Sequence, residues 1–570
     1  MKAWYQTTKR ADFHEIADKF NISPVLARLI RNRDVIGDEE INMYLNGTID
    51  NLYDGMLIKD MDKALDVVKE KIEKEKPIRI IGDYDIDGVN ATYILQKGIE
   101  SLKGRVDTDI PDRVKDGYGL NINLIDKALK DGIDTIITCD NGIAAYNEIM
   151  YAKDNGMAVI VTDHHEVPFK EENGVKKAVL PPADAVLDIK RSDCSYPFKG
   201  LCGAAVAYKF IEALYEVMGC DSKDMQYLIE NAAIATVGDV MELKGENRII
   251  VREGLKRLKY TRNEGIRALI ELNNVPVDRI SPYHIGFVIG PCINASGRLE
   301  TAKTALKLIN ARSESEAKSL ASELIKLNDV RKDMTEKWVE EACDYIESSS
   351  LKDDNVMVVY LPKCHESIAG IIAGRIRERY YRPVFVLTKG EEFVKGSGRS
   401  IETYNMFEEM NKVKEVFVKF GGHKLAAGLS LKEEDVDKFR KKINEVCTLS
   451  EEDLVEKVHF DMTLPFGYIS ENLIEEFDKL EPCGNGNSRA VFAEKGVAVK
   501  SAKVVGRNKN VAKLRIQDSK GDFLDAVYFG EAEEFVSYTQ THERIAIMFY
   551  PDINEYMGMT SVQLVIKDYK

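Results

Sequence analysis

The chain has 570 residues, with a hydrophobic fraction of 44% and a charged fraction of 31%. These values describe a folded protein of about three to five domains and exclude a disordered or fibrous one. It has no apolar run of about 18 residues and no apolar core near its N-terminus, so we expect neither a membrane span nor a signal peptide. Nine scattered cysteines without a CxxC pair predict reduced thiols in a cytoplasmic protein and argue against a zinc knuckle. The net charge of -15, taken alone, argues against a polyanionic partner.

The first 312 residues predict an α/β domain preceded by helices. Residues 1–75 read as helices and loops, and we expect them to pack on the domain that follows. From Pro77, short apolar runs alternate with helical stretches, as in residues 78–81, 135–138 and 158–162. This alternation predicts βαβ units with a mostly parallel sheet over residues 76–312.

The remainder predicts a second α/β block and a β-rich block. Residues 313–350 lack Gly and Pro and favour a long connecting helix. Two apolar runs, 356–361 and 384–387, predict strands of an α/β domain over 351–450. Short β-rich runs separated by turn residues then predict a small β-barrel of the OB type over 451–570. The overall class is therefore α/β with a C-terminal β-barrel.

Acidic residues and histidines follow three of these apolar runs directly. The carboxyl ends of parallel strands are the edge at which ligands bind in such sheets. Crowded carboxylates repel one another, and divalent cations remove that repulsion. Oxygen ligands with one or two imidazoles suit Mn²⁺ or Mg²⁺. The residues are Asp83, Asp85 and Asp87, then Asp140, then Asp163, His164 and His165, and a later apolar stretch ends at Asp239.

Three simpler interpretations compete with a metal site. The pattern DxDxDG also opens EF-hand calcium loops, but the twelfth residue from Asp83 is Ile94 and a strand precedes the motif, so we set the EF-hand aside. The CDNG segment at 139–142 is also typical of a turn, and TDHH at 162–165 of a helix cap. Their occurrence at three strand ends of one chain favours a shared site. Cys139, beside Asp140, is interpreted as a core residue and not as a nucleophile.

The motifs DYDIDG, CDNG, TDHH and VGDVMEL, in this order, resemble those of the DHH phosphoesterase superfamily. Further segments narrow the resemblance to the RecJ family of single-strand-specific exonucleases over residues 80–560. By this resemblance, 76–312 is a DHH domain, 351–450 a DHHA1 domain and 451–570 an OB-like domain, arranged as a clamp around single-stranded DNA. One departure is LEPCG, where Cys483 replaces an aromatic residue. The further segments are IPDRVKDGYG (110–119), PPADAV (181–186), GPCINASGRLETA (290–302), HESIAGIIAGRIRERYYRPVFVL (365–387), GSGRS (396–400), KFGGHKLAAG (419–428) and LEPCGNGN (480–487).

The resemblance implies a two-metal hydrolase that uses Mn²⁺ or Mg²⁺. Asp85 is expected on one metal and Asp87 on the other, with Asp140 bridging them. The role of Asp83, as ligand or as neighbour of a ligand, stays open. The same comparison implies that His164 completes the second metal, that Asp239 is a further ligand, that Asp163 orients His164 through its free ring nitrogen, and that His165 faces the scissile phosphate.

The resemblance also implies that a second set of residues contacts the nucleic-acid backbone. Arg113, Ser397 and Arg399 are expected to grip a terminal 5′ phosphate, which suits the fork of the guanidinium group. Arg298 is expected at the scissile or an adjacent phosphate. The turn that ends in His423 lets the backbone approach the nucleic acid closely, or, alternatively, is a tight turn with a buried histidine.

The implied activity is 5′→3′ degradation of single-stranded DNA to mononucleotides in repair and recombination. Two alternatives remain: a DHH phosphodiesterase for short oligonucleotides or cyclic dinucleotides, and a non-catalytic single-strand-binding replication scaffold. The implied partner is single-stranded DNA, and single-strand-binding protein and a helicase are further candidates. We expect no membrane association and a monomeric protein. Residues 495–515 hold seven basic residues and no acid, so the negative charge is expected on the outer surface around a basic, salt-sensitive inner groove.

Overall fold

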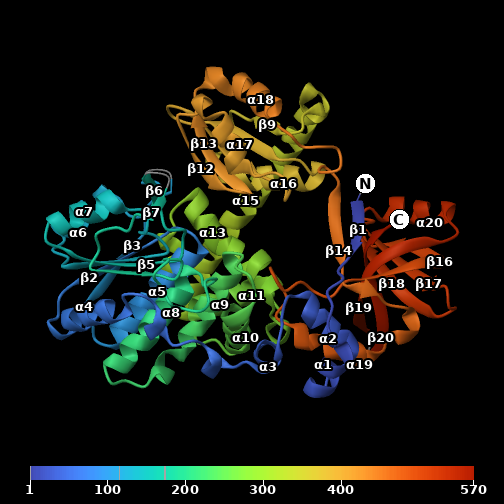
Figure 1. The fold of residues 1–570 in the computed structure, drawn as a ribbon, viewed down its shortest axis with the longest axis horizontal. Helices are drawn as coiled ribbons and strands as arrows, with labels where there is room; N and C mark the ends of the chain where they lie inside the picture. The colour runs from blue at the N-terminus through green and yellow to red at the C-terminus, as the bar shows by residue number, and fades with distance from the viewer. Residues whose placement is uncertain (1, 114–115, 173–174, 557) are drawn as a thin grey trace.

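The computed structural model describes residues 2–113, 116–172, 175–556 and 558–570, so Val114 and Lys115 of the 110–119 motif lie outside the described residues. Three units are visible in Figure 1: an α/β unit on the left, a second α/β unit at the top, and a β-rich unit on the right with both termini beside it. None of the described helices combines the length and the apolar character needed to cross a bilayer.

The left unit is built on a five-stranded sheet with the order β3-β2-β4-β5-β8. All four neighbouring pairs are parallel, as the alternation of apolar runs and helices predicts. The residues of β2 and β4 are buried throughout, because helices cover both faces of a parallel sheet. The strands are β2 (Ile78–Gly82), β3 (Val106–Asp109), β4 (Thr135–Cys139), β5 (Ala158–Asp163) and β8 (Ala185–Asp188). A separate two-stranded antiparallel sheet pairs β6 (Phe169–Glu172) with β7 (Val175–Ala178).

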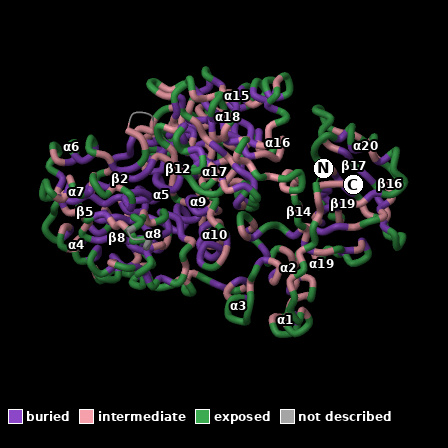
Figure 2. Tube along the Cα trace, turned by 45° about the horizontal axis from the view of Figure 1, so that its top comes forward, coloured by how far each residue is buried: buried purple, intermediate pink, exposed green. Residues whose placement is uncertain are grey.

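Helices complete this unit and supply most of its core. Figure 2 shows the buried residues gathered along β2, β5, α5, α8 and α9. Helices α5 and α8 pack on each other with apolar residues that are almost fully buried, such as Ile94 and Phe210. The helices are α5 (Ile86–Ser101), α6 (Ile122–Lys130), α7 (Tyr146–Asp154), α8 (Gly203–Val217), α9 (Ile229–Gly238), α10 (Gly245–Leu258), α11 (Glu264–Leu272), α12 (Pro282–His284), the π-helix η5 (Ile285–Ile289), α13 (Gly290–Leu299) and α14 (Lys303–Ile309).

The second α/β unit follows a long helix, α15 (Glu314–Glu347), which matches the helix predicted from the lack of Gly and Pro. Its five-stranded sheet has the order β12-β13-β11-β10-β9, in which only β9 and β10 are parallel. The elements are β9 (Met357–Tyr360), α16 (Ala369–Tyr380), β10 (Val384–Lys389), β11 (Val394–Arg399), α17 (Met406–Lys412), β12 (Lys419–His423), β13 (Ala426–Leu431) and α18 (Val436–Glu445).

The β-rich unit closes into a barrel. Its strands pair in the order β16-β17-β18-β20-β19, and β19 pairs back to β16, so the sheet has no free edge between these strands. This agrees with the predicted OB-type barrel. The elements are β14 (Glu456–Phe460), β15 (Met462–Thr463), α19 (Glu471–Glu476), β16 (Phe492–Val505), β17 (Val511–Gln517), β18 (Phe523–Phe529), α20 (Ala532–Thr541), β19 (Ile545–Tyr556) and β20 (Met559–Tyr569).

The N-terminal segment corrects one expectation in part, because its first half packs mainly on the barrel and meets the first α/β unit only where residues 38–46 contact α10. Strand β1 pairs in parallel with β14, and Leu26, Leu29 and Ile30 are buried in one cluster with residues of the barrel. Only the second half, which contains α4, contributes to the core of the first unit. Helical spacing alone does not reveal which distant apolar surface a helix will cover. These elements are β1 (Lys2–Gln6), α1 (Phe13–Phe20), α2 (Pro24–Asn32), α3 (Asp38–Asn46) and α4 (Met61–Glu73).

One buried arginine fastens the barrel unit to the first unit. Arg248 of α10 donates hydrogen bonds to the carbonyl oxygens of Tyr44 at 3.0 Å, Leu480 at 2.8 Å and Lys479 at 2.8 Å. Its guanidinium also lies over the Tyr44 ring, 3.8 Å from the centroid. Because the hydrogen bonds to Tyr44 and Leu480 are buried, solvent cannot replace the guanidinium donors at these two carbonyls.

We therefore expect Arg248→Met to destabilise the protein by about 2–5 kcal/mol, since it leaves several buried acceptors without donors. Arg262→Met is the matched control, because Arg262 is exposed and should change stability by less than about 0.5 kcal/mol. Denaturant unfolding measures both variants. Equal midpoints for Arg248→Met and the wild type would show that the arginine does not fasten the two units.

Candidate metal and phosphate site

Three strands of the parallel sheet end at one group of acids. Asp83 follows β2, Asp140 follows β4, and Asp163 ends β5. Strands β2, β4 and β5 are neighbours in the sheet, so their carboxyl ends lie side by side. Asp140 adopts the left-handed conformation, with a φ of 59°, which turns the chain sharply as it leaves the strand.

Two further acids of the first motif are held at helix N-termini. Asp85 caps α5, and its Oδ1 accepts hydrogen bonds from the backbone N–H groups of Asp87 and Gly88. The fully buried Asp87 carboxylate accepts from the N–H groups of Gly203 and Ala204, both at 2.7 Å, at the start of α8. A helix N-terminus stabilises a carboxylate by its unpaired N–H groups and its dipole.

Gly203 is required for this close approach. A Cβ added there would lie 2.8 Å from the Cβ of Asp140, an atom next to the backbone that has no room to move. The start of α8 can therefore reach Asp87 only with a glycine at this position.

His164 lies at the centre of the acidic group. Its Nε2 is 3.0 Å from Asp140 Oδ1, 3.4 Å from Asp87 Oδ2 and 3.8 Å from Asp239 Oδ2. Asp239 reaches the group from the end of α9 and not from a strand. Potential ligand atoms fall into three overlapping sets, each within 4.8 Å: Asp83, Asp85 and Asp140; Asp87, His164 and Asp239; and Asp140, His164 and His165.

The crowding of these acids shifts their protonation. Burial raises the pKa of Asp140 well above its usual value, and the charge of Asp87 raises it further. Burial likewise raises the pKa of Asp83 and Asp87. Burial and the charges of Asp87 and Asp85 raise the pKa of Asp239 to about 8. The protein alone therefore does not stabilise all these negative charges, which is the condition that bound cations relieve.

The donor set fits divalent cations. The group offers carboxylate oxygens and imidazole nitrogens and no thiolate, which matches Mn²⁺ or Mg²⁺. Asp83 Oδ1 and His164 Nδ1 are buried polar atoms that form no hydrogen bond within the described residues. Cys139 is fully buried beside Thr92 and burial raises the pKa of its thiol, so it is a core residue as expected.

The structure corrects the expected role of Asp163. Its Oδ1 lies 2.8 Å from His165 Nδ1 and also accepts from the backbone N–H of His164, so it orients the ring of His165 and not that of His164. Partial burial disfavours the imidazolium form of His165, but the hydrogen bond to Asp163 and the charges of Asp163 and Asp87 together outweigh it and raise the pKa to about 9. Burial lowers the pKa of His164, which keeps that ring neutral.

A cationic cavity lies next to the acids, between the two α/β units. It has a volume of about 300 Å³ and is lined by Tyr84 and Arg113 from one unit and by Ser367 and Ser397 from the other. The Arg113 guanidinium lies over the Tyr84 ring at 4.8 Å. The serines face it from the second unit, so both units are needed to form the cavity.

Two more arginines stand beside this cavity. Arg298 donates to the Ser367 carbonyl at 2.9 Å and Arg399 to the Gly398 carbonyl at 2.7 Å. Burial, followed by the charges of Arg113 and Arg331, lowers the pKa of Arg298 to about 10; burial also lowers that of Arg399. Within the described residues, Arg113, Arg298 and Arg399 form no ion pair with a carboxylate. Such unneutralised guanidinium groups form a site for an anion.

His423 is not brought into this cavity. It ends the edge strand β12, is exposed, and accepts a hydrogen bond from the N–H of Leu425 through Nδ1. The alternative of a tight turn with a buried histidine is therefore wrong. Ser397 and Arg399, both on β11, do lie at the cavity or beside it.

Several functional contacts were not predicted from the sequence. Tyr118 donates from its hydroxyl to the Asp140 carbonyl at 2.9 Å and lies 3.3 Å from His165 Nδ1. Asn294 accepts from the N–H of Ile86 through Oδ1, which fixes the loop between Asp85 and Asp87. Both residues lie inside motifs that carry the family resemblance, but spacing in the chain does not indicate these contacts.

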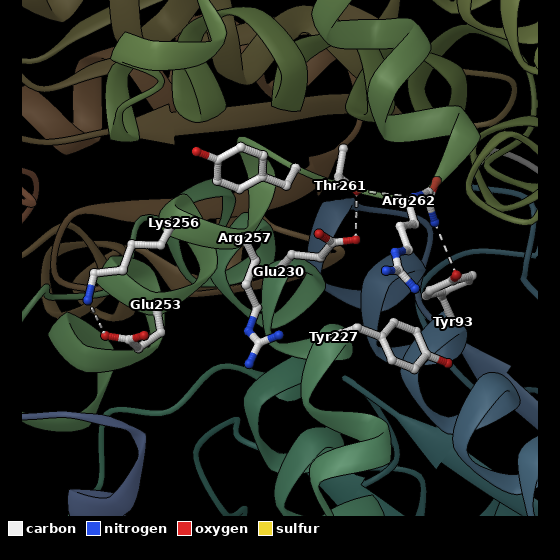
Figure 3. Close-up of a pocket in the computed structure, with 10 residues that line it drawn as sticks. Tyr93, Tyr227, Glu230, Glu253, Lys256, Arg257, Thr261 and Arg262 are labelled. Carbon is white, nitrogen blue, oxygen red and sulfur yellow. Dashed lines mark hydrogen bonds and ion pairs between the residues drawn. The ribbon is translucent and has the colours of Figure 1, made fainter.

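A cavity larger than the one beside the acids lies elsewhere and holds none of the predicted site residues. It measures about 810 Å³ and is lined by residues of α5, α9, α10 and the turn after α10. Figure 3 shows Thr261 donating to Glu230 and Lys256 paired with Glu253 on its wall. Volume alone therefore does not identify the chemical site, whereas the converging carboxylates do.

Family models match three parts of the chain. Residues 77–237 match the DHH family N-terminal domain, 353–449 the DHHA1 domain, and 460–568 the RecJ OB domain. The parallel sheet with its acidic edge therefore defines a protein of the DHH class.

Relatives among characterised proteins narrow this class. The single-stranded-DNA-specific exonuclease RecJ of Bacillus subtilis is 35% identical over 559 residues, covering 97% of this chain and 69% of that protein. The RecJ of Haemophilus influenzae is 30% identical, covering 97% of both chains. This chain belongs to the RecJ family.

A solved structure agrees with this assignment. The RecJ of Thermus thermophilus in complex with Mn²⁺ matches with a TM-score of 0.84 and 26% identity, covering all of this chain and 79% of that one. A second structure, of exonuclease RecJ bound to manganese, matches 68% of this chain and 94% of its own length with 30% identity and a TM-score of 0.58.

We expect Mn²⁺ to raise the thermal unfolding midpoint of the metal-free protein, because a ligand that binds only the folded state stabilises that state. At a Mn²⁺ concentration of about 100 times Kd, the free energy of unfolding should rise by about 2.7 kcal/mol. The gain should be smaller at pH 6 than at pH 8. Raised pKa values mean that carboxyls hold protons at the lower pH, and bound metal must displace them. Asp140→Asn should remove most of the gain. An equal gain in that variant, or a larger gain at pH 6, would contradict the site.

Proposed function

We propose that this protein is a single-stranded-DNA-specific exonuclease that releases mononucleotides from the 5′ end by two-metal-ion hydrolysis, acting in DNA repair and recombination. The observation that carries the proposal is the position, beside a carboxylate cluster, of a cavity that is lined by Arg113 and flanked by Arg298 and Arg399. The cavity suits a terminal phosphate and the cluster suits a reacting phosphodiester. An enzyme that must act at an end needs both features close together.

The carboxylates divide into two sets that suit two cations. Asp83, Asp85 and Asp140 would hold one, and Asp87, His164 and Asp239 the other, with Asp140 also 3.0 Å from His164 and so placed between them. When bound, such a metal pair activates water and offsets the charge of the attacking and leaving oxygens.

Neighbouring residues prepare the site for this chemistry. The α8 N-terminus fixes Asp87 through two backbone hydrogen bonds, and Tyr118 holds the Asp140 backbone. Asp163 keeps the His165 ring oriented and protonated. The partly exposed His165 can therefore present a positive N–H group to an oxygen of the scissile phosphate.

The cavity arginines provide end recognition in this proposal. Arg113 and Arg399 present guanidinium forks to a terminal 5′ phosphate, with the Ser397 hydroxyl between the units. Arg298 lies between this cavity and Asp85, where an adjacent phosphate would pass. His423 is exposed on β12, so we assign it a contact farther along the backbone.

The barrel supplies a surface for the rest of the strand. Lys503 of β16 and Lys513 of β17 are exposed and stand directly opposite each other. Like charges at opposed positions destabilise a sheet, and a nucleic-acid backbone relieves that repulsion. Within the described residues, Lys495, Lys500 and Arg507 are likewise exposed without an ion pair.

The family assignment supports single-stranded DNA as the substrate. We further propose that the enzyme is a cytoplasmic monomer, because its nine cysteines are all free and one chain supplies both the acidic cluster and the phosphate cavity. Single-strand-binding protein and a helicase are proposed as partners on the family resemblance alone.

Asp140→Ala should abolish nuclease activity, by at least about 10³-fold, while the fold is kept, because it removes the carboxylate that belongs to one set and lies 3.0 Å from His164 of the other. The assay uses Mn²⁺ with strands labelled at the 5′ or the 3′ end. The wild type should release 5′-labelled mononucleotides first. Early release of the 3′ label, preference for a dinucleotide, or unchanged DNA handling by Asp140→Ala would refute the proposal.

Arg399→Gln should raise the KM for 5′-phosphorylated strands by about 10–100-fold, because charge-assisted hydrogen bonds contribute about 1.5–3 kcal/mol. A strand with a 5′ hydroxyl should respond much less. Arg375→Gln is the control, since Arg375 is exposed on α16 and, within the part of the chain that the structure describes, its one ion pair is with Glu378. Equal effects on both strand ends would assign Arg399 to a different phosphate.

A further inference from the structure

One face of a helix leads away from the catalytic centre. Helix α12, the π-helix η5 and α13 are consecutive from Pro282 to Leu299. The more accessible side chains of this continuous helical segment follow helical spacing. Tyr283 and Phe287 are exposed, and Pro291, Asn294 and Arg298 are half-buried.

The C-terminal end of this face belongs to the site described above. Asn294 Oδ1 accepts from the N–H of Ile86 at 2.8 Å, and Arg298 stands beside the phosphate cavity. A Cβ on Gly297 would lie 2.3 Å from the carbonyl oxygen of Tyr84, so only a glycine lets the helix come this close. The helix is therefore fixed against the loop that carries Asp85 and Asp87.

The N-terminal end carries two exposed aromatic side chains. Tyr283 is 62% exposed and Phe287 is 69% exposed. Their rings are stacked on each other, with centroids 5.1 Å apart and planes inclined by 26°. Large aromatic surfaces left in water next to a functional site indicate a binding surface for an apolar or planar group.

The π-helix turn places this pair near the acidic centre. Helix η5 contacts α9, the helix that ends at Asp239, and Gly286 faces Val237 across this contact. Just beyond, Val240 is 66% exposed and has a φ of 57°, which is strained for a β-branched residue. A π-turn within a helix is itself a common feature of functional sites.

The spacing fits a polynucleotide that starts in the phosphate cavity. Phe287 and Tyr283 precede Arg298 by 11 and 15 residues, which is about 16–22 Å at 1.5 Å per residue. That length equals about five to seven stacked nucleotides at 3.4 Å each. On the far side, Arg279 pairs with Glu555 of β19 at 3.0 Å, so the aromatic pair also lies beside the contact with the barrel.

We propose that Tyr283 and Phe287 form a base-stacking platform for the single strand between the catalytic centre and the barrel, an inference that rests on the proposed function. Every base has a planar face, so the platform accepts any sequence, whereas a paired base in a duplex cannot reach it. The platform therefore contributes affinity and selects for single strands without reading sequence.

The test measures the Kd of a 5′-phosphorylated 20-mer by fluorescence anisotropy with Mn²⁺, in the Asp140→Asn background so that no strand is cut. Tyr283→Ala with Phe287→Ala should raise the Kd at least tenfold. A 20-mer with abasic nucleotides at positions 4–8 should bind the Asp140→Asn protein as weakly as the intact 20-mer binds the variant that also lacks both aromatic side chains. On this abasic strand, the double substitution should raise the Kd by less than a further twofold. In otherwise unaltered enzyme, KM should rise while kcat stays within twofold.

Three controls separate stacking from other effects. Phe287→Tyr should retain binding, and Phe287→Leu should lose it despite its apolar side chain. Tyr146→Ala, on the distant helix α7, removes an aromatic that is 42% exposed and should change nothing.

An unchanged Kd on the intact strand, or an equal loss on intact and abasic strands, would overturn the platform. These binding results do not depend on turnover, and failure of the wild type to hydrolyse any strand would instead refute the proposed function.

Discussion

The repulsion among buried carboxylates at one edge of a parallel sheet is the constraint on which this structure depends. Asp83, Asp87, Asp140 and Asp163 are each at most 3% exposed. Isolated buried charges are strongly disfavoured, so the fold must offer each acid a partner or a cation. The backbone N–H groups at the α8 N-terminus donate to Asp87, and the His165 ring pairs with Asp163. Asp83 and Asp140, in contrast, retain strongly raised pKa values. The site thus carries an excess of negative charge that bound divalent cations can neutralise.

The second unit completes a phosphate-sized cavity beside this centre, next to arginines of the first unit. Arg298 reaches across to the Ser367 carbonyl, and Ser397 of β11 faces Arg113 and Tyr84 over the cavity. Neither unit alone brings the carboxylates beside a guanidinium cavity. The overall charge of -15 consequently says little about the partner, because local groups of cationic side chains lie at the cavity and on the barrel strands β16 and β17. The proposed aromatic platform would continue this path without adding charge.

Much of the fold could be predicted because its determinants are local. Apolar runs at 78–81, 135–138 and 158–162 became β2, β4 and β5, and the stretch without Gly or Pro became α15. Acids that directly follow strands also end at one sheet edge by geometry, so most of the acidic centre was accessible from the sequence. The packing of residues 1–46 on the barrel was not, since amphipathic spacing shows that a helix covers something but not what. The pairing of Asp163 with His165, and the contacts of Tyr118, Asn294 and Gly203, depend on the relative positions of distant elements, which spacing along the chain does not contain.

Anomalous diffraction from crystals grown with Mn²⁺ tests the central claim most directly. The account predicts two manganese peaks about 3.5–4 Å apart, one beside Asp83 and Asp85, the other beside Asp87, His164 and Asp239, with the Asp140 carboxylate between them. A single peak, two peaks that do not share Asp140, or manganese bound only outside the acidic group would contradict it.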